Sequence, residues 1–200
     1  MNNPPLKPQQ HNVLEDLASK IQQWSAELGF QQTGITDLEL GEHAERYRQW
    51  LDNGSHGSMN YMRDQQALRL DPEKLHPGTL RIISTRMDYL PANVEAVRLL
   101  DHPEKAYISR YALGRDYHKL IRKKLARLAK LISDYALDNT AQIGIECNQR
   151  PFVDSAPVLE RAFAEKSGLG WIGKNTMLIN NGAGSWFFLG ELFTNIPLPI

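Results

Sequence analysis

The sequence predicts an α/β domain in which helices flank a mixed sheet. Two long segments carry apolar side chains at helical spacing, and several short runs are rich in β-branched and aromatic residues. Because the two kinds of segment alternate along the chain, a sheet covered by helices is the favoured architecture. The chain has 200 residues, of which 42% are hydrophobic, so one domain with a sizeable core is expected.

The first part of the chain is expected to supply two helices and two strands. Gly29 stands where the first amphipathic pattern stops, and Pro91 ends the second β-rich run. In the second helix, Tyr47, Trp50 and Leu51 share the face expected to point inward. The expected elements are a helix over 13–28, a strand over 30–36, a helix over 42–52, loops with short helical turns over 55–79, and a strand over 80–90.

The second part is expected to hold the longest helix and the remaining strands. That helix runs from Asp116 to about Leu137, and its apolar stripe consists of Leu120, Ile121, Leu125, Leu128, Ile132 and Tyr135. Short β-rich runs lie on both sides of it. The strands expected there cover residues 106–111, 143–145, 151–153 and 186–193.

Composition excludes several classes of protein. There are 23 basic and 23 acidic residues, so the bulk charge indicates no particular partner. The longest apolar runs, such as FFLGELF, are far shorter than the roughly 20 residues that a membrane helix needs. Residues 1–11 are polar and proline-rich without an apolar secretory core. We therefore expect a cytoplasmic protein with a flexible tail over 1–11 and a domain over 12–200.

Cysteine and histidine usage argues against a metal centre built from these residues alone. Cys147 is the only cysteine, which excludes an internal disulfide, a four-cysteine zinc site and a self-contained iron-sulfur cluster. The six histidines are scattered and form no HxxxH or HExxH pair that would place two ligands on one helical face. No metal ligands are therefore assigned.

The long helix carries a local positive excess in an otherwise neutral chain. A solvated basic face is the default interpretation of such a pattern, and contact with nucleic-acid phosphates is the alternative. The basic residues are Lys119, Arg122, Lys123, Lys124, Arg127 and Lys130.

The segment from Arg150 to Thr176 contains the most suggestive acid, Asp154. Phe152 and Val153 read as a strand end, and Asp154 and Ser155 are residue types that cap helices. Pro157 suits the first turn of a helix. An acid between strand and helix is well placed for proton transfer, although Asp154 could also be only a cap.

A glycine-rich loop follows that helix and imitates two nucleotide-binding motifs. Gly168, Gly170 and Gly173 spell GxGxxG, and the loop also fits most of GxxxxGK. Both interpretations are disfavoured, because the glycines follow a helix and position 175 is Asn instead of Ser or Thr. A helix C-cap at Gly168 with Trp171 as a core anchor is one alternative. Close approach to a large flat ligand, with Lys174, Asn175 and Thr176 along its edge, is another.

Four stretches together resemble the epoxyqueuosine reductase family, which is similar to reductive dehalogenases. They are RPFVDSAPVLERAFAEKSGLGWIGKN, SRYALGRDYHK, DPEKLHPGTLRIIS and GSWFFLGELFTNIPLP. The resemblance covers about residues 13–200 and implies a single cobalamin-binding domain. It also implies the activity, a cobalamin-dependent reduction of epoxyqueuosine to queuosine in tRNA, the last step of queuosine synthesis.

The resemblance implies which residues form the site. It places the proton donor on Asp154, and we expect Phe152, Val153, Pro157 and Val158 to keep that carboxyl protonated by apolar burial. It also implies contacts of the cofactor with further residues; those expected at cobalamin are Arg69, Ser109, Asp154, Ser155, Ala156, Pro157, Val158, Leu159, Leu178 and Leu189. The alternatives are ordinary core positions for Leu178 and Leu189 and a surface ion pair for Arg69. The motif match also implies that Tyr117, His118, Lys174 and Asn175 lie near the site, in roles left open.

The family departs from this chain after the motif ending in PLP. Its members continue into a ferredoxin-like part with cysteines for two 4Fe-4S clusters and a helical-repeat tail. We therefore expect the N-terminal catalytic portion of a monomeric reductase acting on tRNA that carries epoxyqueuosine, with electrons supplied by the missing iron-sulfur part. The alternative is a noncatalytic module that binds cobalamin or tRNA.

Overall fold

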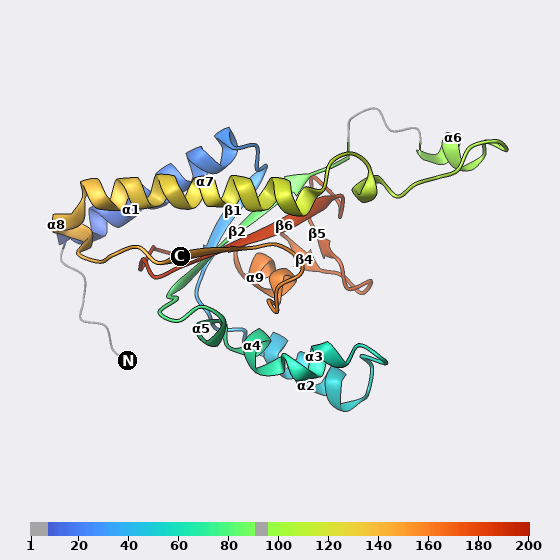
Figure 1. The fold of residues 1–200 in the computed structure, drawn as a ribbon, viewed down its shortest axis with the longest axis horizontal. Coiled ribbons are helices and arrows are strands. Elements are labelled where there is room, and N and C mark those ends of the chain that lie inside the picture. The colour runs from blue at the N-terminus through green and yellow to red at the C-terminus, as the bar shows by residue number, and fades with distance from the viewer. Residues whose placement is uncertain (1–7, 91–95) are drawn as a thin grey trace.

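The computed structural model describes residues 8–90 and 96–200, and its centre is a four-stranded sheet (Figure 1). The strands lie in the order β1 (Gln32–Thr36), β2 (Arg81–Asp88), β6 (Phe187–Thr194) and β3 (Gln149–Phe152). The α/β class with flanking helices is confirmed, but all three strand pairs are antiparallel. Alternation along the chain does not determine strand direction, because long connections can return the chain either way.

Two long helices cover one face of the sheet. The helices α1 (Pro8–Glu27) and α7 (Tyr117–Asp138) lie along this face, with α8 (Thr140–Ile143) after them (Figure 1). Fully buried side chains of both helices join the core; they are Leu17, Ile21, Ile121, Leu125, Leu128 and Ile132. On β6, a Cβ at Gly190 would lie 2.7 Å from Cγ2 of Ile121, so glycine permits the close approach of α7.

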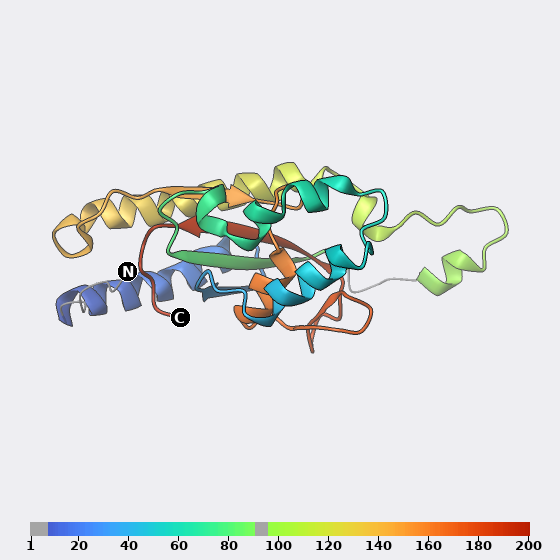
Figure 2. The same cartoon turned by 90° about the horizontal axis from the view of Figure 1, so that it is seen from below.

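The opposite face carries shorter elements that surround a pocket. Beneath the sheet lie α9 (Glu160–Lys166) and a two-stranded hairpin of β4 (Trp171–Ile172) and β5 (Leu178–Ile179) (Figures 1 and 2). Phe163 of α9 packs with Phe193 of β6 in a second core cluster. Further from the sheet are α2 (Glu42–Asp52), α3 (Asn60–Asp64), α4 (Gln66–Leu70) and α5 (Pro72–Leu75).

An extended segment projects from the end of the sheet in both views (Figures 1 and 2). It contains α6 (Ala96–Leu100) and the 3-10 turn η1 (Arg110–Ala112). The strand expected over 106–111 is wrong, because this segment pairs with no strand of the described chain. Strand propensity without a partner strand is not sufficient to form a sheet.

Several other boundaries differ from the expected ones. The first helix begins at Pro8, inside the tail expected over 1–11, because proline is accommodated in a first helical turn. The strand expected over 143–145 is wrong: Ile143 ends α8, and Gly144 follows in the left-handed conformation. Leu120 is 44% exposed, so the buried stripe of α7 begins at Ile121. The expected stop at Pro91 lies outside the described residues.

Candidate active site

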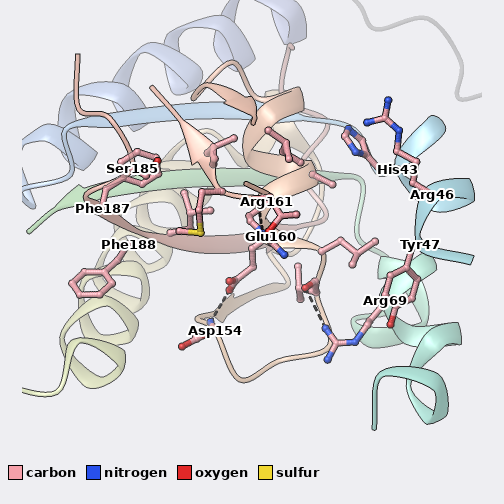
Figure 3. Close-up of a pocket in the computed structure, with 18 of the residues that line it drawn as sticks. His43, Arg46, Tyr47, Arg69, Asp154, Glu160, Arg161, Ser185, Phe187 and Phe188 are labelled. Atoms are coloured by element: carbon pink, nitrogen blue, oxygen red, sulfur yellow. Dashed lines mark hydrogen bonds between the residues drawn. The ribbon is translucent and has the colours of Figure 1, made fainter. Parts of the chain in front are cut away.

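A pocket of about 810 Å³ opens beneath the sheet, between the hairpin β4–β5 and the helices α2 to α4 (Figure 3). Its walls come from segments far apart in the sequence, which α9 and β6 bring together. Six residues predicted for the site line it: Arg69, Asp154, Val158, Leu159, Leu178 and Leu189. The volume is within the range of about 300 to 1,000 Å³ that is typical of small-molecule sites.

Asp154 lies on a strained turn and does not cap a helix. Its φ of 57° is in the left-handed region, which costs a residue with a Cβ roughly 1 kcal/mol. The helix α9 begins only at Glu160, and its N-cap, Leu159, makes no side-chain cap. Between them the backbone makes two tight turns, with Ser155 N–H donating to Val153 O at 2.7 Å and Val158 N–H to Ala156 O at 2.8 Å. The capping roles expected for Asp154 and Ser155 and the helical position of Pro157 are therefore wrong.

The Asp154 carboxylate meets two side chains from the start of α7. The Tyr117 hydroxyl donates a hydrogen bond to Oδ2, and His118 Nε2 lies 2.9 Å from the same oxygen. Asp116 orients the imidazole, because its Oδ1 accepts from His118 N–H at 3.0 Å and lies 3.0 Å from Nδ1. The Tyr117 ring stacks on Phe188 with centroids 3.9 Å apart. Tyr117 and His118, whose roles the sequence left open, thus both contact Asp154.

The electrostatics of this cluster keep Tyr117 a hydrogen-bond donor. Burial raises the pKa of the Tyr117 phenol, and the hydrogen bond to Asp154 raises it further. The hydrogen bond with His118 holds the pKa of Asp116 below its usual value. We expected apolar side chains of this chain to enclose the Asp154 carboxyl. That expectation is wrong, because the Asp154 side chain is 55% exposed. Phe152 and Val153 point into the core and do not surround it.

Arg69 is a buried cation at the pocket wall. The residue is only 9% exposed, and its Nη1 donates to Val158 O at 3.5 Å (Figure 3). Its Nε is buried and has no hydrogen-bond partner among the described residues. A surface ion pair, the alternative interpretation of Arg69, is therefore wrong.

The remaining predicted residues lie near the pocket without lining it. Ser109 is exposed at the N-cap of η1, whereas Tyr111 two residues later does line the pocket. Ser155, Ala156 and Pro157 lie on the Asp154 turn but outside the pocket wall. In the turn between β4 and β5, Lys174 and Asn175 are also outside the wall. Cofactor contacts of these residues stay predictions.

The glycine-rich loop shapes one side of the pocket. Gly168, with φ 77°, ends α9, and Leu169 N–H donates to Ala164 O at 2.9 Å, which confirms the predicted helix C-cap. The loop then enters the β4–β5 hairpin and no helix, so it lacks the helix N-terminus that a dinucleotide fingerprint requires. Trp171 is 49% exposed, and its interpretation as a core anchor is wrong.

Sequence reasoning missed several residues of the site, of which Glu160 is the most prominent. Its Oε1 accepts a hydrogen bond from Asp154 N–H at 2.6 Å, and it lines the pocket. Burial raises the pKa of Glu160 to about 7. One signal in the sequence could have identified Glu160: it is an acidic residue at the start of the helix that follows Asp154. The helix α2 also contributes His43, Arg46 and Tyr47, which only the tertiary structure could place here.

The part of the chain that the structure describes contains neither a candidate metal site nor a candidate membrane-spanning helix. No three histidine, cysteine or carboxylate side chains lie close enough to hold a metal ion. No helix of that part has the length and apolar character needed to cross a membrane.

Comparisons with known proteins point to one family. Residues 69–155 match the family model described as epoxyqueuosine reductase QueG, DUF1730. The chain is 57% identical over 184 residues to an epoxyqueuosine reductase of Pseudomonas aeruginosa, covering 92% of this chain and 49% of the relative. It is 52% identical over 187 residues to that of Escherichia coli K12, covering 94% and 47%. The chain thus spans about half the length of the curated relatives it matches.

Solved structures show the same fold. An epoxyqueuosine reductase in complex with an epoxyqueuosine-modified tRNA stem loop has a TM-score of 0.70 at 23% identity, covering 92% of this chain and 46% of that one. The Bacillus subtilis enzyme, described with its catalytic aspartate loop swung out of the active site, has a TM-score of 0.64 at 22% identity, covering 92% and 48%. A reductive dehalogenase described as B12-dependent has a TM-score of 0.50 at 15% identity, covering 100% and 21%.

Proposed function

Because this chain is related over more than nine tenths of its length to the epoxyqueuosine reductases, we propose that it is the cobalamin-binding, catalytic half of such an enzyme. The substrate is epoxyqueuosine in tRNA, and the product is queuosine. The observation that carries this proposal is the Asp154 carboxylate, held by Tyr117 and His118 at the edge of a large, partly apolar pocket. The domain includes α1 and therefore begins at Pro8, and the protein is cytoplasmic and monomeric.

The lining of the pocket fits a cobalamin. Val158, Leu159, Leu178 and Leu189 supply apolar contacts for a large flat macrocycle. The buried guanidinium of Arg69, whose Nε has no partner among the described residues, supplies a donor for a polar or anionic group at the edge. When bound, the reduced cofactor supplies the electrons that break the carbon–oxygen bonds of the epoxide. Those electrons come from an iron-sulfur part of the kind the family contains, because Cys147 alone cannot ligate a cluster.

Asp154 performs the proton transfer. Converting an epoxide to an alkene and water consumes two electrons and two protons, and the departing oxygen must be protonated as it leaves. The Asp154 carboxyl donates one of these protons to that oxygen and water supplies the other, while the Tyr117 hydroxyl stabilises the resulting Asp154 carboxylate by donating to Oδ2. His118, aligned by Asp116, lies beside the same oxygen and holds the carboxyl in one orientation.

The basic face of α7 is proposed to contact the tRNA. Arg122, Lys123 and Arg127 form no salt bridge with any residue in the described ranges, so their charges are available to phosphates. The helix begins at Tyr117 and His118, next to the pocket. A relative bound to a tRNA stem loop supports a nucleic-acid partner.

Substituting Asp154 tests the central role. In the full-length enzyme, Asp154→Asn is expected to retain cob(II)alamin, because the pocket wall is unchanged, and to lose turnover by at least about 100-fold, the usual size of a general-acid contribution. Absorption spectra and co-elution on a sizing column measure the cofactor, and conversion of epoxyqueuosine-containing tRNA measures turnover.

The contrary outcomes separate the alternatives. Unchanged turnover in Asp154→Asn would remove Asp154 from the chemistry. Absence of cob(II)alamin binding by both this chain and the full-length protein would refute the cofactor assignment. Binding of cofactor or tRNA with no turnover in the unsubstituted full-length protein would instead identify a noncatalytic binding module.

A further inference from the structure

The backbone of Asp154 is held by a side chain that takes no part in the proposed proton transfer. Asp154 N–H donates to Oε1 of Glu160 at 2.6 Å, across six residues (Figure 3). Asp154 is one of two residues other than glycine with positive φ in the described chain, the other being Thr176. A left-handed residue with a side chain persists only where its surroundings hold it in place. The short bond to Glu160 is such a contact.

The rest of the turn offers few competing anchors. Its two internal hydrogen bonds, Ser155 to Val153 and Val158 to Ala156, each span only two residues and do not tie the turn to the domain. At the far end, Arg69 reaches Val158 O at the long distance of 3.5 Å. Tyr117 and His118 hold the Asp154 carboxylate, and Glu160 is the side chain that holds its backbone N–H.

Glu160 stands on a rigid base. It is the first residue of α9, and the residues that follow on this helix, Ala162, Phe163 and Ala164, are buried in the core. Its own carboxyl lies among charged groups, with Asp154 opposing its charge and Arg69 and Arg161 favouring it. The hydrogen bond that this carboxyl accepts comes from the Asp154 backbone N–H.

We propose that Glu160 is a positioning residue: by accepting the Asp154 amide, it fixes the left-handed turn that aims the Asp154 carboxyl at Tyr117, His118 and the pocket. This inference rests on the proposed function, since the turn matters for turnover only if Asp154 transfers the proton. The length of the side chain at position 160 decides whether this hydrogen bond forms, because the Asp154 amide needs an acceptor oxygen at this distance and does not need a charge.

Three substitutions separate reach from charge. Glu160→Gln keeps an acceptor oxygen at the same distance and loses the charge. Glu160→Asp keeps the charge and is one methylene too short, and Glu160→Ala loses both. In this chain, hydrogen exchange of peptides covering 153–159 is expected to accelerate up to about tenfold in the Asp and Ala variants and to stay near the wild-type rate in Gln, because the loss of one intramolecular hydrogen bond corresponds to a factor of up to about ten.

Glu165 provides a matched control on the same helix. Its Oε1 accepts from Ile172 N–H at 2.6 Å, the same type of bond at the opposite end of α9. Glu165→Ala should accelerate exchange around residues 170–173 and leave 153–159 unchanged. If Glu160→Ala does not fold, the Asp and Gln variants still decide the question.

Turnover in the full-length enzyme gives the second readout. The Asp variant is expected to lose kcat by about 10- to 100-fold with KM and cob(II)alamin affinity unchanged, as expected for a misplaced catalytic group, and the Gln variant to retain most activity. Equal exchange rates in the Asp and wild-type proteins, or activity that follows charge instead of reach, would overturn the positioning role. If Asp154→Asn keeps its turnover while the exchange pattern is as expected, the proton-donor role of Asp154 fails and the contact between Glu160 and the Asp154 backbone stands.

Discussion

At the scale of single residues, the Tyr117 hydroxyl is the contact on which the proposed chemistry depends most directly. Its ring is fixed by stacking on Phe188, with an interplanar angle of 8°, and its hydroxyl donates to Asp154. Because the pKa of this phenol is raised above its usual value of 10, the hydroxyl keeps its proton at neutral pH and remains a donor. A phenylalanine at this position would keep the stack and lose only the hydrogen bond.

Tyr117→Phe is therefore expected to lower kcat by about 10-fold, the value of one hydrogen bond to a charged group, with little change in cofactor affinity. Steady-state kinetics of the full-length enzyme measure this. Tyr135→Phe is the matched control, because Tyr135 donates to the Asp16 carboxylate at 2.6 Å near the other end of α7, away from the pocket. The control should leave kcat unchanged, and an equal loss in both variants would argue for a general effect on α7.

At the scale of elements, β6 carries an unusual buried acid at the centre of the sheet. Glu191 is 0% exposed and accepts a hydrogen bond from the Ser84 hydroxyl at 2.5 Å, while its Oε1 has no partner among the described residues. Burial raises the pKa of Glu191 well above its usual 4.5, which Ser84 only partly offsets. A carboxyl whose pKa is raised by burial stays protonated in the folded state. It lowers the stability of the folded state at any pH at which the same carboxyl is ionised in the unfolded chain.

The sign of the resulting pH dependence follows from linkage. The unfolded state releases the Glu191 proton near pH 4.5 and the folded state only at higher pH, so the free energy of unfolding falls as pH rises above 4.5. Glu191→Gln supplies a neutral side chain of the same shape and removes this contribution. The stability of the variant relative to wild type should therefore increase from pH 4.5 to 8, as measured by urea denaturation at several pH values. A constant difference would show that Glu191 is ionised in the folded protein.

At the scale of the whole molecule, the charge is balanced but unevenly distributed. The two long helices cover one face, and the pocket opens on the other side of the sheet, with the start of α7 linking the two regions (Figure 1). Arg122, Lys123 and Arg127, here called the α7 track, lie on the helix whose first turn carries Tyr117 and His118 of the Asp154 cluster. Under the proposed function, this track would contact tRNA phosphates outside the pocket.

The double substitution Arg122→Glu with Lys123→Glu should weaken binding of an epoxyqueuosine-containing tRNA stem loop at every salt concentration. The dependence of log affinity on log salt should become shallower by about one for each phosphate that the protein no longer neutralises. Fluorescence anisotropy over a salt series measures both effects. Arg48→Glu with Lys74→Glu, two exposed cations of α2 and α5, is the control for net charge. Equal effects of the two double variants would argue against a specific track on α7.

Local patterns in the sequence predicted much of the secondary structure. The helix over 42–52 and the long helix from Asp116 were identified by apolar spacing, because that spacing records which side of a helix is buried. The strands expected over 106–111 and 143–145 were wrong, because a strand requires a neighbouring strand, which local sequence does not specify. The burial of Trp171 was misjudged for a similar reason: an aromatic side chain is buried only where another segment packs over it, and local sequence does not specify that segment.

The sequence by itself determined the periodic helices, the position of Asp154 between a strand and a helix, and the motifs that the epoxyqueuosine reductases share. Only the tertiary structure decided that Tyr117 and His118, more than 35 residues away, meet its carboxylate, and that Glu160 holds its amide. The physical reason is that the buried face of a helix or strand is encoded by the spacing of apolar residues within that segment alone. Contacts between distant segments depend on how α7 packs across β6 and how α9 sits beneath it, and these follow from the whole core.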